Sequence, residues 1–510
     1  MTLSRRDFLK LSSLIASSAA LASCAPVDRV LAPLADLPWP ALDPADFLAL
    51  NRLTFGPRPE ERQRLLEIGL AGWIEEQLAP DSLEDRLCDF RLRNLPTLSM
   101  SASDLADVSD RIFENVDRAR VPAELRQATL LRQVFSRRQL HEVMVEFWSD
   151  HFNIATAKGD CFFLKTIDDR EVIRRHALGS FRDLLWGSAH SPAMLVYLDN
   201  QANRKEAPNE NYARELMELH TLGVDGGYSQ RDVMELARCL TGWTVKEHFW
   251  RGQFTFDQDA HDRGSKTVLG LEIGNEGQAE AEAVLELLAA HPSTARFISA
   301  KLARRFLSDA PPEDIVARAA AVFMETKGDI RAVLRVILLT DLGGLVAGDD
   351  ALGQYRPLGS RLQPKYKRPV NFIVSALRML NAETDGADPL QDYLLRMGQA
   401  YFGWPMPDGY PDRGEPWQGS LMPRWQFAFG LVRNEIAGTQ VDLQELAAVS
   451  GAAALADSAD QLASLLLGAP LDPGVRDGLL ADIRSAGAAD DEAAQLMAGG
   501  LLASPAFQWR

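Results

Sequence analysis

The chain has 510 residues, of which 46% are hydrophobic and 25% are charged, as in ordinary globular proteins. This composition argues against intrinsic disorder, and the length allows one large domain or two to three modest ones. The formal net charge of −17 disfavours binding to a nucleic-acid backbone, which requires clustered Lys and Arg side chains. Nucleic acid is therefore set aside as a class of partner.

Residues 1–24 have the pattern of an export signal. Arg5 and Arg6 precede a mildly apolar run that is too short to span a bilayer. The segment resembles a twin-arginine signal, which directs folded proteins across the membrane. We therefore expect a periplasmic or surface-exposed protein.

Two cleavage sites are compatible with this segment. The sequence LASC at 21–24 resembles a lipobox, in which Cys24 would be acylated and become the mature N-terminus. The sequence ALA at 20–22 would suit an ordinary signal peptidase. In both cases the body of the protein would touch the membrane only through its signal or a lipid anchor.

After a Pro/Ala-rich linker at 25–45, residues 46–510 read as one helical domain. Two helices are expected around Gly69, and some thirty residues from Pro122 carry helical periodicity. Similar patterns recur at 167–178, 209–222, 229–241, 276–290, 293–307, 312–326, 329–340, 369–381 and 418–436. The best strand patterns, at 249–257 and 266–273, suggest one small hairpin. The predicted fold is all-α, a large multi-helix bundle or helical array with at most a small β-hairpin.

All eight histidines fall between residues 141 and 291, which directs the search for chemistry to this window. In a helical projection of 141–153, Glu142, Glu146 and Asp150 share one arc. Trp148 and His151 share another arc. The helix is therefore expected to have one carboxylate face and one apolar face that bears histidine.

The segment 209–227 gives a similar pattern, with Glu215 and Glu218 on one side and His220 on the apolar side. These carboxylates are either solvated and paired with Arg214, or they point into a bundle where they could meet imidazoles around a metal ion. The sequence alone leaves both interpretations open.

A third element places His261 beside Asp262, with Lys266 after a Gly-Ser turn. On a loop, such an imidazole, carboxylate and ammonium could act as base, orienting group and electrophile. The alternative interpretation is ordinary surface detail.

The Pro-rich segment 401–425 carries Trp404, Tyr410, Trp417 and Trp425. Rigid loops that present aromatic rings suit amphipathic ligands such as sugar rings, or a partner protein. The alternative is a loop that wraps over the helical core and is fixed there by its aromatic side chains.

Six stretches of the chain resemble one bacterial family, the domain of unknown function 1800 family. They are FWSDHFN (147–153), NENYARELMELHTLGVDGGYSQRDVMELARCLTGW (209–243), HDRGSKTVLG (261–270), YKRPVNFIVSALRML (366–380), PDGYP (407–411) and LLASPAFQWR (501–510). The resemblance implies an exported bacterial protein, without an established activity, that is often encoded beside a second exported protein similar to sulfatases and alkaline phosphatases. It implies no catalytic residue.

The leading functional hypothesis is a metal-dependent hydrolase that acts on an envelope or extracellular substrate. The candidate ligands of a divalent metal are His151, Glu215 and His220, and the candidate catalytic residues are Glu218, His261 and Asp262. The alternative hypothesis is a non-catalytic scaffold, or a chaperone-like partner of the co-exported sulfatase- or phosphatase-like protein.

The N-terminal sequence leads to a prediction about export. Replacing Arg5 and Arg6 with Lys should leave unprocessed precursor in the cytoplasm, because the twin-arginine route reads the arginine pair. Replacing Cys24 with Ala should release the mature protein from the membrane fraction. Cell fractionation and immunoblotting measure both effects. Normal export of the double-lysine variant would exclude the twin-arginine route, and unchanged membrane association of Cys24→Ala would indicate another anchor.

Overall fold

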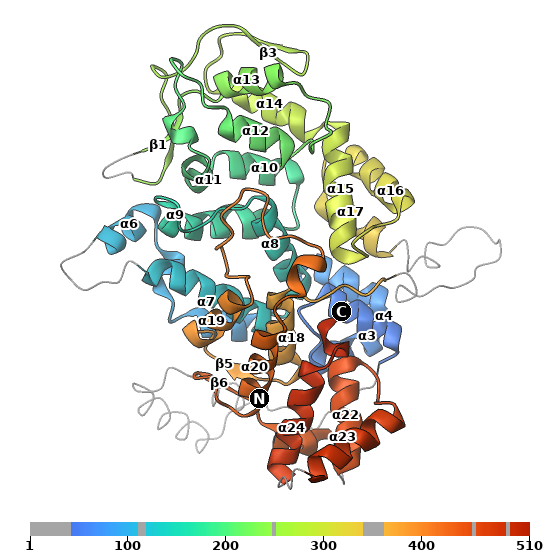
Figure 1. Cartoon of the computed structure of the whole chain (residues 1–510). Coiled ribbons are helices and arrows are strands. Elements are labelled where there is room, and N and C mark those ends of the chain that lie inside the picture. The colour runs from blue at the N-terminus through green and yellow to red at the C-terminus, as the bar shows by residue number, and fades with distance from the viewer. Residues whose placement is uncertain (1–41, 111–118, 247–250, 340–361, 451–454, 486–489) are drawn as a thin grey trace, which may run out of the picture.

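The structure, a computed structural model, describes residues 42–110, 119–246, 251–339, 362–450, 455–485 and 490–510. The expected signal at 1–24, with Cys24, and most of the linker at 25–45 lie outside these ranges. Helices dominate the described residues, and the sheets among them have two strands each, so the predicted all-α class is confirmed (Figure 1). No helix among these residues is long and apolar enough to cross a membrane.

Most helices begin and end within a few residues of the predicted ranges. The N-terminal third contains α3 (Pro44–Leu53), α4 (Pro59–Leu78), α5 (Arg86–Leu92), α6 (Ala102–Asp110), α7 (Arg120–Phe135) and α8 (Gln139–His151). The central part contains α9 (Cys161–Asp168), the π-helical turn η5 (Asp169–Arg174), α10 (Phe181–Ala189), α11 (Pro192–Tyr197), α12 (Glu210–Glu218), α13 (Gln230–Cys239) and α14 (Ala279–Ala289). The remaining helices are α15 (Pro292–Phe306), α16 (Glu313–Glu325), α17 (Ile330–Leu339), α18 (Pro369–Met379), α19 (Asp388–Arg396), α20 (Leu421–Val432), α21 (Leu443–Ser450), α22 (Leu455–Leu467), α23 (Pro473–Ser485) and α24 (Asp490–Ala503).

Two interruptions explain how the helical periodicity is divided. Inside α4, Gly69 has a φ of 70°, a left-handed conformation that breaks the helix where the sequence predicted a break. The thirty-residue pattern after Pro122 is split between α7 and α8, because Ser136 leaves the helical conformation at the end of α7. Asp85 fixes this corner by accepting hydrogen bonds from Ser136 Oγ and Arg137 N, at 2.5 and 3.0 Å.

The predicted hairpin between 249–257 and 266–273 is wrong in its pairing. Strand β2 (Phe254–Phe256) pairs with β1 (Trp243–Val245), and β3 (Lys266–Val268) pairs with β4 (Leu271–Ile273). The third sheet joins β5 (Glu383–Thr384) to β6 (Thr439–Gln440). Each segment of the expected hairpin thus pairs with a nearer partner, which costs less loop-closure entropy.

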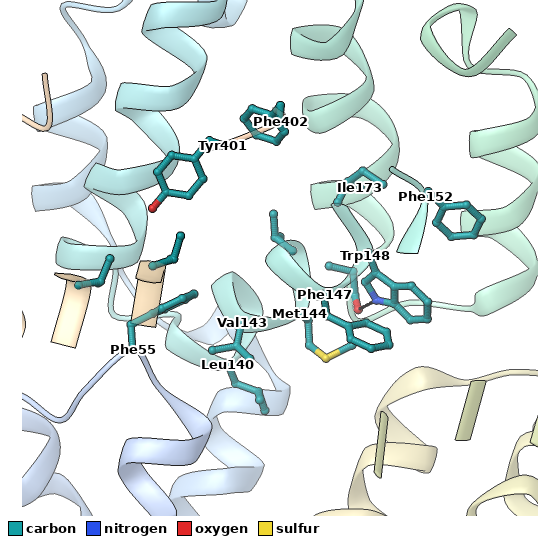
Figure 2. Packing of buried hydrophobic residues seen from close by; sticks show 14 of the residues in the cluster. Phe55, Leu140, Val143, Met144, Phe147, Trp148, Phe152, Ile173, Tyr401 and Phe402 are labelled. Carbon is teal, nitrogen blue, oxygen red and sulfur yellow. Dashed lines mark hydrogen bonds between the residues drawn. The ribbon is translucent and has the colours of Figure 1, made fainter. Parts of the chain in front are cut away.

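Helix α8 lies near the middle of the array, and its apolar face forms part of the core (Figures 1 and 2). Met144, Trp148 and Phe152 are fully or almost fully buried. The indole N–H of Trp148 donates to the carbonyl of Ala177 at 2.9 Å, which satisfies the polar atom of this buried ring. The opposite face of α8 is also turned inward, because Glu142 and Glu146 are buried as well. Carboxylates in such a position must be paired.

A buried guanidinium joins distant parts of the chain. Arg52 in α3 is 1% exposed, and burial lowers its pKa to about 10. Its donors reach the carbonyls of Phe306 (3.0 Å), Leu307 (2.8 Å), Gln363 (2.7 Å) and Arg510 (2.8 Å). One side chain therefore ties α3 to the end of α15, to the chain before α18 and to the C-terminal residue.

Two further arginines act in the same way. Arg378 in α18 is fully buried and donates to the carbonyls of Gly56 and Val134, at 2.7 and 2.5 Å. Arg424 in α20 donates to the carbonyl of Lys367 at 2.7 Å. Carbonyls that no helix or sheet can satisfy are paired by these guanidinium groups.

The contacts of Arg52 predict its effect on stability. Arg52→Met should lower the free energy of unfolding by at least about 3 kcal/mol, because four carbonyls lose a donor and three of these hydrogen bonds are buried. The matched control is Arg335→Met, which removes an exposed pair with Glu75 and should cost less than about 1 kcal/mol. Urea unfolding followed by tryptophan fluorescence measures both values. Equal effects of the two substitutions would contradict the role given to Arg52.

Candidate active site

A cavity of about 280 Å³ lies between α8, α15 and the segment before α20. Helix α8 contributes Phe147, Asp150 and His151, and α15 contributes Phe297, Lys301, Arg304 and Arg305. Arg368, at the start of α18, and residues 408–413 complete the lining. Four of the stretches that carry the family resemblance are near one another here. Three of them contribute to the lining through α8, Arg368 and Asp408. The fourth is the C-terminal stretch, which ends at the carbonyl that Arg52 binds.

Lys301 and His151 are in direct polar contact at the cavity wall. Lys301 Nζ lies 2.8 Å from His151 Nδ1, and His151 Nε2 lies 3.1 Å from the carbonyl of His220. A carbonyl can only accept a hydrogen bond, so Nε2 must carry the proton of a neutral imidazole. Nδ1 is then the acceptor for Lys301. The ring of Phe297 lies 5.5 Å from Lys301 Nζ on the other side.

Burial sets the protonation states of this group. It lowers the pKa of His151 well below 6.5, and the positive charge of Lys301 lowers it further. Burial also lowers the pKa of Lys301 from 10.5 to about 8, although the charge of Asp150 opposes this shift. A neutral histidine therefore faces a lysine that loses its proton near pH 8. Lysines with a pKa in this range can serve as general bases.

The carboxylate face of α8 is held by two arginines. Glu146 pairs with Arg305 and lies 2.5 Å from a guanidinium nitrogen of Arg368. Arg368 also donates to Asp150 at 2.7 Å. Burial alone would raise the pKa of Glu146, but Arg305 and Arg368 together lower it. For Asp150, burial raises the pKa despite Arg368, and the charge of Glu146 adds to the rise.

A second, smaller cavity of about 30 Å³ lies behind this face and shares Asp150 and Tyr410 with the first. Glu142 and Glu146 line it together with Arg174. The volume suits one or a few water molecules, and the polar lining offers the partners that a buried water needs. The arc of carboxylates predicted for α8 is thus present, and the structure shows that it is turned inward and borders both cavities.

The Pro-rich segment forms the outer wall of the larger cavity. Gly409 has a φ of 73°, and a Cβ atom there would lie 2.0 Å from the carbonyl oxygen of Asp150, so only glycine allows this close approach. The side chain of Asn153 donates to the carbonyl of Met406 at 2.7 Å. Tyr410 lies between Trp404 and Trp417, with ring centroids 5.0 and 5.8 Å away. These aromatic rings fix the segment on the core, whereas Trp425 stays 43% exposed.

The carboxylates of α12 do not meet the histidines. Glu215 and Glu218 are half-buried, and Glu218 receives only a 3.4 Å hydrogen bond from Tyr228. Burial and the charge of Glu218 raise the pKa of Glu215. Arg214 pairs with Glu210 instead. The side chains of Glu215 and Glu218 therefore give α12 a partly solvated face.

His220 lies beyond the end of α12, because the helix stops at Glu218 and the chain turns back through Gly223. The His220 ring packs 6.2 Å from the His151 ring and 5.1 Å from Phe152, measured between centroids. Neither of its ring nitrogens has a hydrogen-bond partner among the described residues. Burial lowers its pKa to about 3, and Lys301 adds to this shift. Two of the predicted ligands, His151 and His220, are thus neighbours.

His261 and Lys266 belong to a separate buried cluster around Glu280. Glu280 Oε1 lies 3.0 Å from His261 Nε2, and Glu280 Oε2 lies 2.5 Å from Lys266 Nζ. Asp262 instead pairs with Arg238 at 2.7 Å, and this hydrogen bond lowers the pKa of Asp262. All three members of the Glu280 cluster are 2% exposed or less, so they fix the β3–β4 hairpin against α14.

A divalent metal does not fit the predicted ligands as they lie. In the part of the chain that the structure describes, no group of three or more His, Cys, Asp or Glu side chains is arranged to hold a metal ion. Both ring nitrogens of His151 already have partners, Lys301 and the His220 carbonyl.

The functional residue that sequence reasoning missed is Lys301. It follows Phe297 by four residues and precedes Arg304 by three, on one face of α15.

The environment of Lys301 predicts its reactivity. Acylation of its amine by an N-hydroxysuccinimide ester should have a midpoint near pH 8, because only the unprotonated amine reacts and burial favours that form. Mass spectrometry of digests taken across a pH series measures the labelled fraction, with the exposed Lys327 as the comparison in the same sample. A Lys301 midpoint equal to that of Lys327 would contradict the described environment.

Comparison with known proteins agrees with the resemblance seen in the sequence. Residues 48–509 match a family described as "Protein of unknown function (DUF1800)". No curated protein and no solved structure matches the chain. Because the match spans most of its length, the chain belongs to the DUF1800 family.

Proposed function

We propose that the protein is an exported cell-envelope hydrolase with its active site in the cavity between α8, α15 and residues 408–413. The observation that carries this proposal is the 2.8 Å contact of Lys301 Nζ with neutral His151 at the cavity wall. A partly buried lysine whose pKa is lowered to about 8, in a concave site, is typical of acid–base catalysis.

The geometry gives each group a role. In its neutral form, the amine of Lys301 would take a proton from a water molecule that attacks the ester carbon or phosphorus of the substrate. The ammonium formed in this step would return a proton to the departing alkoxide, so that one water is consumed and an acid and an alcohol are released. His151 is a positioning residue, because its Nδ1 lone pair orients Lys301 and the His220 carbonyl fixes its ring.

Export is the second part of the proposal, and its support is the N-terminal sequence with Arg5, Arg6 and Cys24. The twin-arginine route carries folded proteins. That property suits an active site whose parts come from residues as far apart in the chain as His151 and Asp412.

A second candidate function is a non-catalytic scaffold, or a chaperone-like partner of a co-exported sulfatase- or phosphatase-like protein. Large apolar side chains of the 401–425 segment favour it, since Met406 is 56% exposed and Met422 is 59% exposed. Exposed apolar side chains are common at protein contact surfaces. This alternative requires no titratable group in the cavity, so substitution of Lys301 would leave the function intact.

The enzyme proposal predicts the behaviour of a Lys301 variant. With a panel of p-nitrophenyl esters, kcat of the wild type should rise with pH through a midpoint near 8, because the neutral amine is the base. Lys301→Met should lower kcat by about 100-fold or more. Its free energy of unfolding at pH 7 should not fall, because the substitution removes a partly buried charge.

Lys327→Met is the matched control, since Lys327 is exposed and is not among the residues that line the cavity. Unchanged turnover in Lys301→Met would end the assignment of Lys301 as the base. Loss of wild-type activity on chelation, with recovery on adding a divalent ion, would favour the metal-dependent hydrolase instead.

A further inference from the structure

The cavity concentrates positive charge in a chain whose formal net charge is −17. Its lining includes the cationic side chains of Lys301, Arg304, Arg305, Arg368 and Arg413. The carboxylates in the same lining are those of Asp150, Asp408 and Asp412. A concave site with an excess of one charge attracts ligands of the opposite charge.

Part of this charge is already committed within the protein. Arg305 pairs with Glu146, and Arg368 pairs with Glu146 and Asp150. Asp412 lies 3.4 Å from Lys365 and 3.7 Å from Arg305. Burial would raise the pKa of Asp412, but Lys365 and Arg305 together hold it well below its usual range. We call these paired groups the floor of the cavity.

Two arginines at the cavity remain available. Arg304 is half-buried, and its guanidinium donates only from Nε, to the carbonyl of Asp309 at 3.3 Å. Arg413 is exposed, and within the described ranges its side chain has no ion pair or hydrogen bond. The nearby carboxylate of Asp408 accepts a hydrogen bond from Trp404 Nε1 at 2.8 Å. The terminal nitrogens of Arg304 and Arg413 are therefore free to bind a ligand.

The floor also contains donors that no protein group satisfies. The Nε atoms of Arg305 and Arg368 have no hydrogen-bond partner among the described residues, although both side chains are only 2% exposed. Buried donors of this kind are normally paired. Both Nε atoms are themselves buried, so the binding of a ligand in the cavity rests on Arg304 and Arg413.

We propose that Arg304 and Arg413 bind an oxyanion of the substrate, so that the cavity accepts esters that carry a carboxylate, phosphate or sulfate group. The planar guanidinium fork matches such groups with two parallel hydrogen bonds. Lys301 and Arg304 are three residues apart on α15, which places them on one face about one helical turn apart. The anionic group would thus lie close to the ester group that the water activated by Lys301 attacks. This inference rests on the proposed function, because it takes the bound ester to be the substrate that is hydrolysed. The binding of an anion is measured separately, without any turnover of substrate.

The test is calorimetric titration of the mature protein with inorganic phosphate, sulfate or acetate, at constant ionic strength set with sodium chloride. The wild type should bind at least one of these anions. The double variant Arg304→Gln and Arg413→Gln should weaken that binding about tenfold or more, because two charge-assisted contacts are lost. The anion that binds most tightly identifies the group on the substrate.

The matched control is the double variant Arg296→Gln and Arg318→Gln, which removes the same charge from exposed pairs with Glu313 and Asp314. It should bind the anion as the wild type does. Absence of binding in the wild type, or an equal loss in both double variants, would overturn the anion site. Neither result depends on whether Lys301→Met still hydrolyses esters, so the two proposals fail separately.

Discussion

The fold depends on buried guanidinium groups that pair with backbone carbonyls between helices. In an array of many short helices, the chain ends each helix with carbonyls that have no partner in that helix. Arg52 supplies donors to such carbonyls at the end of α15, Arg378 does so at the end of α7, and Arg424 pairs the carbonyl of Lys367 before α18. Arginine suits this role because it presents five donors in a fixed plane and stays charged when buried. The positions of these three side chains therefore determine where several helix ends can meet.

Buried arginines also hold the candidate site together, but there they pair with carboxylates. On the inner face of α8, Arg305 and Arg368 meet the carboxylates of Glu146 and Asp150 instead of carbonyls. A helix with two buried faces can only be stable if its acidic side is neutralised in this way. Arg305, Arg368 and Asp150 of this network also line the cavity, where the charge of Asp150 raises the pKa of Lys301. A requirement of the fold thus produces the electrostatics of the cavity.

Periodicity in the sequence predicted most of the helices, and the projection of α8 correctly separated its carboxylate arc from its aromatic arc. It could not tell that both arcs are buried, because a polar arc has the same pattern whether it faces solvent or a cavity. His151 and His220 were both among the candidate metal ligands, and their rings are neighbours. Lys301 was missed because a lysine on an amphipathic helix is typical of a solvated face.

The errors have physical causes as well. The hairpin was paired wrongly because the 251–257 and 266–273 segments have strand patterns that do not specify a partner. The cluster of His261 and Lys266 was identified from adjacent residues, but its centre is Glu280, which no local pattern links to them. Contacts between distant segments decide the chemistry here, and such contacts leave no periodic signal.

The hydrogen bond between Arg52 and the carbonyl of Arg510 joins residues 458 positions apart, and the bond between Arg368 and Asp150 spans 218 positions. Contacts of such long sequence separation slow folding, because most of the chain must be ordered before they form. The cavity is complete only when α8, α15 and the segment around Gly409 have all docked. A fragment that ends before residue 368 would contain both Lys301 and His151 and still lack the floor and outer wall of the site.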